Sequence, residues 1–142
     1  MRVMINHEGH EEHEEIELRD CPESLITVVV DAAVAVHRGL GPGLLESVYE
    51  KALAFELAQR EVACECQVAV PVSYRGHELG VGFRADVIVD GCLLLELKSV
   101  DALAGLHLAQ AMTYLRLLGL KRGLLLNFNT RLMKEGIKRV SI

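Results

Sequence analysis

The chain has 142 residues, of which 51% are apolar and 25% charged, and its formal net charge at pH 7 is −5. This length and balance indicate one globular domain. No apolar run reaches the roughly 18 residues that cross a membrane, and the N-terminus lacks the apolar stretch of a signal peptide, so we expect a cytoplasmic protein with no membrane partner.

The charges are distributed unevenly. Residues 1–26 hold eight acidic and two basic residues, which leaves twelve acidic and thirteen basic ones, a charge of +1, for the remainder. Residues 1–20 are polar and acidic without apolar periodicity, which predicts a flexible N-terminal tail ahead of a single domain over residues 21–142. A C-terminal basic cluster predicts either contacts with phosphates or a solvated surface; its members are Arg116, Lys121, Arg122, Arg131, Lys134, Lys138 and Arg139.

Two helices are predicted first. Residues 22–24 form a helix start, and an apolar helix follows to about residue 38. A glycine-rich segment, residues 39–43, breaks it. The second helix covers residues 44–60, where Leu45, Val48, Ala52 and Phe55 recur at helical spacing and predict the face that contacts the core.

The periodicity then changes to two. Strands are predicted over residues 66–74, 79–89 and 92–99, followed by a helix that Asp101 caps and that Gly119 closes after residue 118. Residues 123–128 form an apolar strand, and residues 137–141 add an edge strand. The order predicts an α/β fold with a mixed sheet flanked by helices.

The third of these strands combines an acidic and a basic residue on one face. Leu94, Glu96 and Lys98 alternate with leucines, so that a carboxylate and an ammonium group emerge together from a buried strand. Burying charge costs several kcal/mol unless it is paired or bound to a metal. A structural ion pair between Glu96 and Lys98 and a functional site are both open at this point.

Asp86 lies on the preceding strand, and the turn between the strands decides whether it meets Glu96. A two-residue turn at Asp90 and Gly91 would place Asp86 on the opposite face. A three-residue loop, residues 89–91, would pair Ile88 with Cys92 and bring Asp86 to the face of Glu96. In that register Asp86 opposes Leu94 and Arg84 opposes Glu96. We predict the bulged loop.

Two carboxylates on one face form an oxygen-rich site that suits Mg²⁺ or Mn²⁺. Such an ion lowers the pKa of bound water and polarises a phosphoryl oxygen. Lys98 is then placed to position the water or to offset charge on the phosphate.

Two helices carry further polar candidates. On the third helix His107, Gln110 and Tyr114 fall along one stripe. On the second helix Glu46 and Tyr49 share a face, although a carboxylate in a first turn is also stabilised by the helix dipole alone. These stripes predict polar groups that position a substrate.

At these residues the sequence resembles the GxxExxY protein family of the PD-(D/E)XK nuclease superfamily. Gly43, Glu46 and Tyr49 match the signature that names the family, and the resemblance runs from about residue 25 to residue 142. It also includes residues 37–43, 83–86, 96–98 and 124–128, with His107, Gln110 and Tyr114.

The resemblance implies a restriction-endonuclease-like fold with an α-β-β-β-α-β core, in agreement with the predicted order. It implies that Asp86 and Glu96 bind the metal, that Lys98 is the catalytic lysine and that Glu46 joins the metal site. Gln110 and Tyr114 resemble the QxxxY element of nuclease domains in bacterial recombination exonucleases.

We therefore expect a Mg²⁺- or Mn²⁺-dependent nuclease that hydrolyses nucleic acid, with DNA favoured over RNA. The backbone carbonyl of Leu97 is expected as a further metal ligand, and His107, Gln110, Tyr114 and Tyr49 as substrate-positioning residues. By analogy with small resolvases of the same superfamily we expect a homodimer. The alternative is a non-catalytic nucleic-acid-binding or regulatory module that keeps the nuclease fold.

Overall fold

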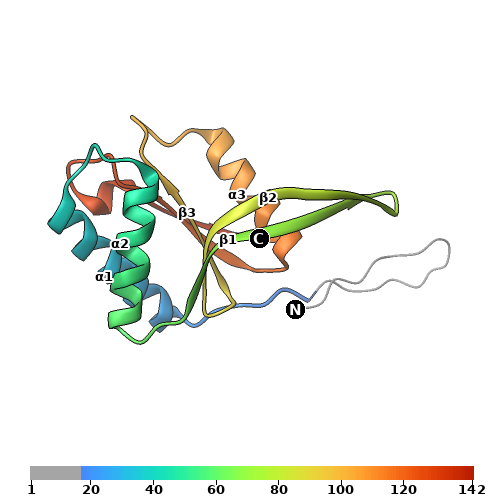
Figure 1. Ribbon diagram of the computed structural model, residues 1–142, viewed down its shortest axis with the longest axis horizontal. Coiled ribbons are helices and arrows are strands. Elements are labelled where there is room, and N and C mark those ends of the chain that lie inside the picture. The colour runs from blue at the N-terminus through green and yellow to red at the C-terminus, as the bar shows by residue number, and fades with distance from the viewer. Residues whose placement is uncertain (1–16) are drawn as a thin grey trace.

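A computed structural model describes residues 17–142 (Figure 1). The helices and strands follow the predicted order, including the last edge strand, with one short 3₁₀ helix in addition. The elements are α1 (Glu23–Leu40), α2 (Glu46–Gln59), β1 (Cys64–Tyr74), β2 (His77–Val89), β3 (Leu93–Lys98), α3 (Gly105–Leu118), β4 (Arg122–Asn127), η1 (Met133–Gly136) and β5 (Ile137–Ser141).

The five strands form one mixed sheet in the order β1-β2-β3-β4-β5. β1 pairs antiparallel with β2, and β2 pairs antiparallel with β3. β3 and β4 are parallel, and β5 returns antiparallel to β4. Parallel neighbours need a crossover connection, and α3 supplies it. The predicted α/β fold with a mixed sheet is confirmed. The β1–β2 hairpin extends well beyond the body of the sheet (Figure 1).

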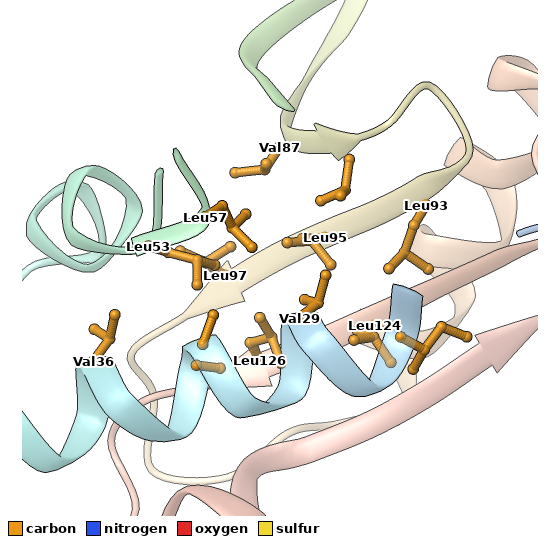
Figure 2. Close-up of a cluster of buried hydrophobic side chains, with 14 of the residues drawn as sticks. Val29, Val36, Leu53, Leu57, Val87, Leu93, Leu95, Leu97, Leu124 and Leu126 are labelled. Carbon is orange, nitrogen blue, oxygen red and sulfur yellow. The ribbon is translucent and has the colours of Figure 1, made fainter. Parts of the chain in front are cut away.

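The core has two parts, one on each face of the sheet. We call the first the α1–α2 core; Figure 2 shows its side chains between the two helices and the sheet, among them Val29, Val36, Leu53, Leu57, Val87, Leu93, Leu95, Leu97, Leu124 and Leu126. We call the second the α3 core; its buried residues are Ala85, Ile88, Leu94, Ala111, Leu115, Leu120, Leu125 and Val140.

The alternation along β3 is confirmed. Leu93, Leu95 and Leu97 belong to the α1–α2 core, whereas Leu94 belongs to the α3 core. Each buried leucine stabilises the fold by roughly 2 kcal/mol. Because side chains alternate along a strand, residues 96 and 98 extend the α3 side, so the charged end of β3 lies under α3.

The predicted core face of α2 is wrong. Leu45 and Phe55 are 73% and 65% exposed, while Tyr49, Leu53 and Leu57 are fully buried. Both sets have helical spacing, so the pattern alone could not choose between them. The buried set is fixed by aromatic packing, because the ring of Tyr49 stacks on Phe128 with the centroids 4.5 Å apart.

The third helix starts later than predicted, at Gly105, and Asp101 is not its cap. The buried side chain of Asn127 explains the delay. Its Oδ1 accepts a hydrogen bond from the N–H of Val100 at 3.1 Å, and its Nδ2 donates to the carbonyl oxygen of Val100 at 3.0 Å. These hydrogen bonds hold the backbone at Val100 against the end of β4, so that α3 starts further along the chain.

The segment before α1 is attached to the sheet. Arg19 donates its backbone N–H to the carbonyl oxygen of Gly119 and accepts from the N–H of Lys121, both at 2.9 Å. Arg19, which falls within the predicted tail, is therefore bonded to the segment between α3 and β4. The rest of that predicted tail, residues 1–16, lies outside the described residues. Within residues 17–142 no helix is long and apolar enough to cross a membrane.

Candidate active site

The predicted carboxylates meet where β2 separates from β3. The paired register ends with Val87 opposite Leu95, and its continuation places Asp86 opposite Glu96. There the backbone of each strand binds a side chain of the other. The N–H of Asp86 donates to Oε2 of Glu96 at 3.2 Å, and the N–H of Leu97 donates to Oδ2 of Asp86 at 2.8 Å. The two carboxylates therefore accept the backbone hydrogen bonds that carbonyl oxygens would accept in a regular pair of strands.

The turn between these strands differs in detail from both predicted forms. Asp90 and Gly91 have φ angles of 50° and 65°, and Cys92 donates its N–H to the carbonyl oxygen of Val89. Val89 nevertheless pairs with Leu93, so that Cys92 is the inserted residue. The register is shifted by two residues from the predicted bulge, which keeps the parity that brings Asp86 to Glu96.

β2 also changes its buried side at Asp86. Phe83 and Ala85 belong to the α3 core, whereas Val87 and Val89 belong to the α1–α2 core. Because neighbours on a strand point to opposite faces, Arg84 lies opposite to Phe83 and Ala85. The prediction that Arg84 shares the face of Glu96 is therefore wrong.

Glu96 is buried, with 5% of its surface exposed. Burial raises the pKa of its carboxyl to about 7, and the charge of Asp86 is the second cause. Glu46 adds a smaller rise, while the hydrogen bond from Asp86 N–H and the ammonium group of Lys98 act in the opposite direction. The site therefore holds more negative charge than Lys98 offsets, which favours a bound cation.

Glu46 reaches the end of β3 from the first turn of α2. Its Oε2 accepts a hydrogen bond from the N–H of Ser99 at 3.3 Å, and the hydroxyl of Ser99 donates to the carbonyl oxygen of Leu44 at 2.9 Å. A cavity of about 580 Å³ opens here and is lined by residues 43–47, Ser99 and Asn129. It borders Glu46 and does not include Asp86 or Glu96.

Tyr49 does not fit the predicted role in substrate positioning. Its side chain is fully buried, its hydroxyl donates to the carbonyl oxygen of Gly41, and it accepts from the N–H of Leu44 at 3.1 Å. A buried tyrosine needs such partners for its hydroxyl. The structure assigns Tyr49 to holding the loop between α1 and α2.

α3 brings Tyr114 to the site. Its ring stacks on Phe83 with the centroids 3.9 Å apart, and burial together with the charges of Glu96 and Asp86 raises the pKa of its hydroxyl. Gln110, one turn earlier, is exposed. His107 accepts a hydrogen bond at Nδ1 from the N–H of Ala104 at 2.9 Å, so one of its nitrogens is occupied at the start of α3.

Two site residues were not predicted. Gln67 of β1 donates from Nε2 to Oε1 of Glu50 at 2.7 Å and to Oδ1 of Asp86 at 3.5 Å. Glu50 could have been found, because it follows Glu46 by four residues and shares its helix face. Gln67 could not, because its side chain reaches the site through a left-handed backbone, with a φ of 54°, that a strand pattern does not reveal.

The groups that could hold a metal are the carboxylates of Asp86 and Glu96 and the carbonyl of Leu97, with the carboxylate of Glu46 at the end of β3 as a further oxygen donor. The N–H and C=O of a strand residue point to the same side, so the Leu97 carbonyl faces the gap in which its N–H binds Asp86. An all-oxygen set with uncompensated negative charge fits a hard divalent cation. As positioned, no group of three or more His, Cys, Asp or Glu residues among residues 17–142 is arranged to enclose an ion.

Two arginines of the C-terminal basic cluster lie away from the carboxylates of Asp86 and Glu96. Arg122 pairs with Asp20 at 2.8 Å and with Glu23 at 3.6 Å, and Arg139 also pairs with Glu23. Arg122 is opposite Leu93, the first residue of β3, at the far end of that strand from the charged site. These two arginines therefore stabilise the N-terminal segment, and their geometry does not favour contacts with a substrate at the carboxylates.

The chain matches the model of a known protein family. The model of the PD-(D/E)XK nuclease superfamily matches residues 23–140. No curated protein and no solved structure matches the chain. The matched region runs from the start of α1 into β5 and includes the carboxylate pair of β2 and β3 with the lysine that follows it. By this match over most of its length, the chain belongs to the PD-(D/E)XK nuclease superfamily.

Proposed function

We propose that the protein hydrolyses phosphodiester bonds of nucleic acid with a Mg²⁺ or Mn²⁺ ion held by Asp86 and Glu96. Membership of the superfamily indicates a nuclease-type function and a nucleic-acid substrate, and such nucleases generally use divalent metal ions. The observation that carries the proposal is the reciprocal pair of hydrogen bonds that holds the two carboxylates together at the end of β3, beside Lys98.

Each group has a role in this proposal. A divalent ion at the carboxylates supplies activation of water and polarisation of the phosphate. Asp86 and Glu96 hold it, and Glu46 and the Leu97 carbonyl complete the oxygen ligands. Lys98 orients the attacking water or offsets the charge that develops on the phosphate.

The face of α3 positions the substrate. Tyr114 lies near both carboxylates, and Gln110 presents an exposed amide one turn away. His107 contributes through the ring nitrogen that does not bind Ala104. These side chains donate hydrogen bonds that suit phosphate oxygens.

Replacing Asp86 with asparagine is expected to abolish binding of Mn²⁺, because the substitution removes a charged ligand. The amide oxygen still accepts from the N–H of Leu97, so the fold should persist. Isothermal titration calorimetry of the full chain measures the affinity, in a background in which His7, His10 and His13 are glutamine so that these histidines cannot bind the ion. Asp101→Asn, an exposed aspartate after β3, is the matched control. Equal binding in Asp86→Asn and Asp101→Asn would contradict the site.

Two observations favour the second candidate, a non-catalytic nucleic-acid-binding or regulatory module. Within residues 17–142 no group of three or more His, Cys, Asp or Glu residues is arranged to hold an ion, and two basic residues of the C-terminal cluster are paired far from the carboxylates. Cleavage that requires a divalent ion and stops when the ion is chelated would decide for the nuclease. Binding of nucleic acid without cleavage at millimolar Mn²⁺ would decide for the module.

We further propose that the substrate is DNA rather than RNA, that the chain belongs to the GxxExxY family, that the protein is cytoplasmic and that it forms a homodimer.

The exposed apolar stripe at α2, formed by Leu45, Val48 and Phe55, supports the homodimer. The residues are spaced by three and by seven, as in a helix that packs against another helix. Light scattering should give the mass of two chains, and Phe55→Glu should give the mass of one. A wild-type mass of one chain would contradict the dimer.

A further inference from the structure

Gln67 has an unfavourable backbone conformation beside the carboxylates. Its φ is 54°, in the left-handed region that residues other than glycine rarely adopt. Its neighbours pair regularly, Cys66 with Val87 and Val68 with Ala85, while the position between them, Gln67 opposite Asp86, is missing from the ladder. The irregularity therefore coincides with the residue that holds the site together.

The left-handed conformation of Gln67 reverses the faces of the sheet to which the side chains of β1 point. Cys64 packs against the α1–α2 core and Val68 against the α3 core, although residues four apart share a face in a regular strand. A glycine would adopt this conformation without steric cost. The presence of glutamine indicates that its side chain contributes something that glycine lacks.

That contribution is a bridge between two carboxylates. Nε2 of Gln67 donates to Oε1 of Glu50 at 2.7 Å, which fixes the amide against α2, and to Oδ1 of Asp86 at 3.5 Å, near the upper limit of a hydrogen bond. Oδ2 of the same aspartate is held by Leu97. An amide can donate to both acids without adding positive charge, so it restrains Asp86 and leaves the attraction for a cation intact.

We propose that Gln67, anchored by Glu50, is a positioning residue that orients the carboxylate of Asp86 for the metal ion. This inference rests on the proposed function, since it assigns an outer support to the same site. Outer partners of metal ligands fix the orientation of the ligand, and their loss lowers metal affinity by roughly 10- to 100-fold. Strained conformations of this kind persist where they serve a site.

Variants of Gln67 distinguish the effect of its backbone conformation from the effect of its side-chain amide. Gln67→Gly keeps the left-handed backbone and removes the side chain. Its melting temperature in chelator is expected to stay within roughly 3 °C of wild type or to rise, while its affinity for Mn²⁺ falls on the order of 10-fold. Gln67→Asn also tolerates a positive φ but is one methylene too short for both acids, and it should lose affinity in the same way.

Two further variants distinguish positioning from a structural role. Glu61 also has a positive φ, 60°, and is exposed at the end of α2, so Glu61→Gly is the matched control, which should raise the melting temperature and leave Mn²⁺ affinity unchanged. Glu50→Gln retains an oxygen that accepts from Gln67 and should keep the affinity, whereas Glu50→Ala should lose it. In a Gln67→Gly background Glu50→Ala should cause no further loss, because partners in one network are not additive.

The outcomes are distinct. Wild-type protein that binds Mn²⁺ through Asp86, with Gln67→Gly and Gln67→Asn binding within about twofold of it, would overturn the positioning role and leave the proposed function standing. Equal losses in Glu50→Gln and Glu50→Ala would also overturn the bridge, since the charge of Glu50 would then act directly. Wild-type protein that binds no Mn²⁺ up to millimolar concentration would overturn both proposals.

Discussion

Replacing Glu96 with glutamine is expected to raise the free energy of unfolding of the metal-free protein by about 3 kcal/mol at about pH 8, and to change it little at about pH 4. The physical reason is the burial of a carboxylate next to Asp86, which raises the pKa of Glu96 to about 7. Glutamine cannot ionise, and its amide oxygen still accepts from the N–H of Asp86.

The pH window follows from where the folded and unfolded states release the proton of Glu96. The unfolded chain releases it near the ordinary value of 4.5, and the folded protein near 7. Between these values the folded state binds more protons than the unfolded state. The free energy of unfolding of the wild type therefore falls as the pH rises from about 4.5 to about 7, and the penalty stays constant above that range.

Urea denaturation in chelator, repeated at several pH values from about 4 to 8, measures this difference. Glu65→Gln, an exposed glutamate on β1, is the control and should change the free energy of unfolding by less than about 0.5 kcal/mol throughout. Equal stability of Glu96→Gln and wild type at about pH 8 would show that Glu96 ionises without penalty. Millimolar Mg²⁺ should stabilise the wild type and Glu65→Gln but not Glu96→Gln, because only the Glu96 carboxylate binds it.

The burial of this carboxylate also explains why the candidate site could be proposed from the sequence. A glutamate in a run of buried leucines conflicts with the local preference for apolar side chains, and such conflicts mark functional positions. Glu96 and Lys98 were identified in this way, and Asp86 followed from the turn. The order of helices and strands was equally accessible, because the change from helical to alternating spacing occurs at residue 64 in the structure, close to the predicted 66.

The parts that could not be predicted depend on tertiary contacts. α2 carries two apolar stripes, and only the stacking of Tyr49 on Phe128, a residue that follows β4, decides which of them is buried. The same contact buries the side chain of Tyr49, which its spacing from Glu46 did not predict. A periodic pattern gives the faces of a helix, and the partner that covers each face lies elsewhere in the chain.

The register of β2 and β3 shows a second limit. The predicted bulged loop paired Ile88 with Cys92, whereas Val89 pairs with Leu93 in the structure, because the identity of Asp90 and Gly91 gives the turn and not the position of the extra residue. Asp86 nevertheless lies opposite Glu96, because a shift of two residues preserves the parity of the register. β1 and β2 switch the face that they bury at Gln67 and Asp86, and the alternation of apolar and polar residues in the sequence does not reveal this switch.

Replacing Lys98 with alanine is expected to lower the rate of cleavage by on the order of 100- to 1,000-fold while the protein stays folded. Lys98 is half-buried at the end of β3, and its ammonium group interacts with Glu96. In the proposed mechanism it binds no metal and acts on the water or on the charge of the phosphate. Its loss should therefore remove a contribution to the transition state and leave the metal ligands in place.

Cleavage is measured with Mn²⁺ on supercoiled plasmid DNA, single-stranded DNA, a four-way DNA junction and an RNA of the same sequence, with chelator as the blank. Lys51→Ala, an exposed lysine on α2 outside the basic cluster, is the matched control and should cleave like wild type. Lys98→Arg keeps the charge but changes its shape and hydration, and it should restore part of the rate if charge is what matters.

The affinity for Mn²⁺ separates Lys98 from the carboxylates. Removing a positive charge beside Glu96 lessens repulsion of the ion, so Lys98→Ala should bind Mn²⁺ as tightly as wild type or more tightly. Asp86→Asn should lose both binding and cleavage. A Lys98→Ala protein that cleaves within about threefold of wild type would remove this lysine from the mechanism. One that loses Mn²⁺ affinity would instead place Lys98 among the groups that shape the metal site, because a residue acting only on the transition state leaves ground-state metal binding unchanged.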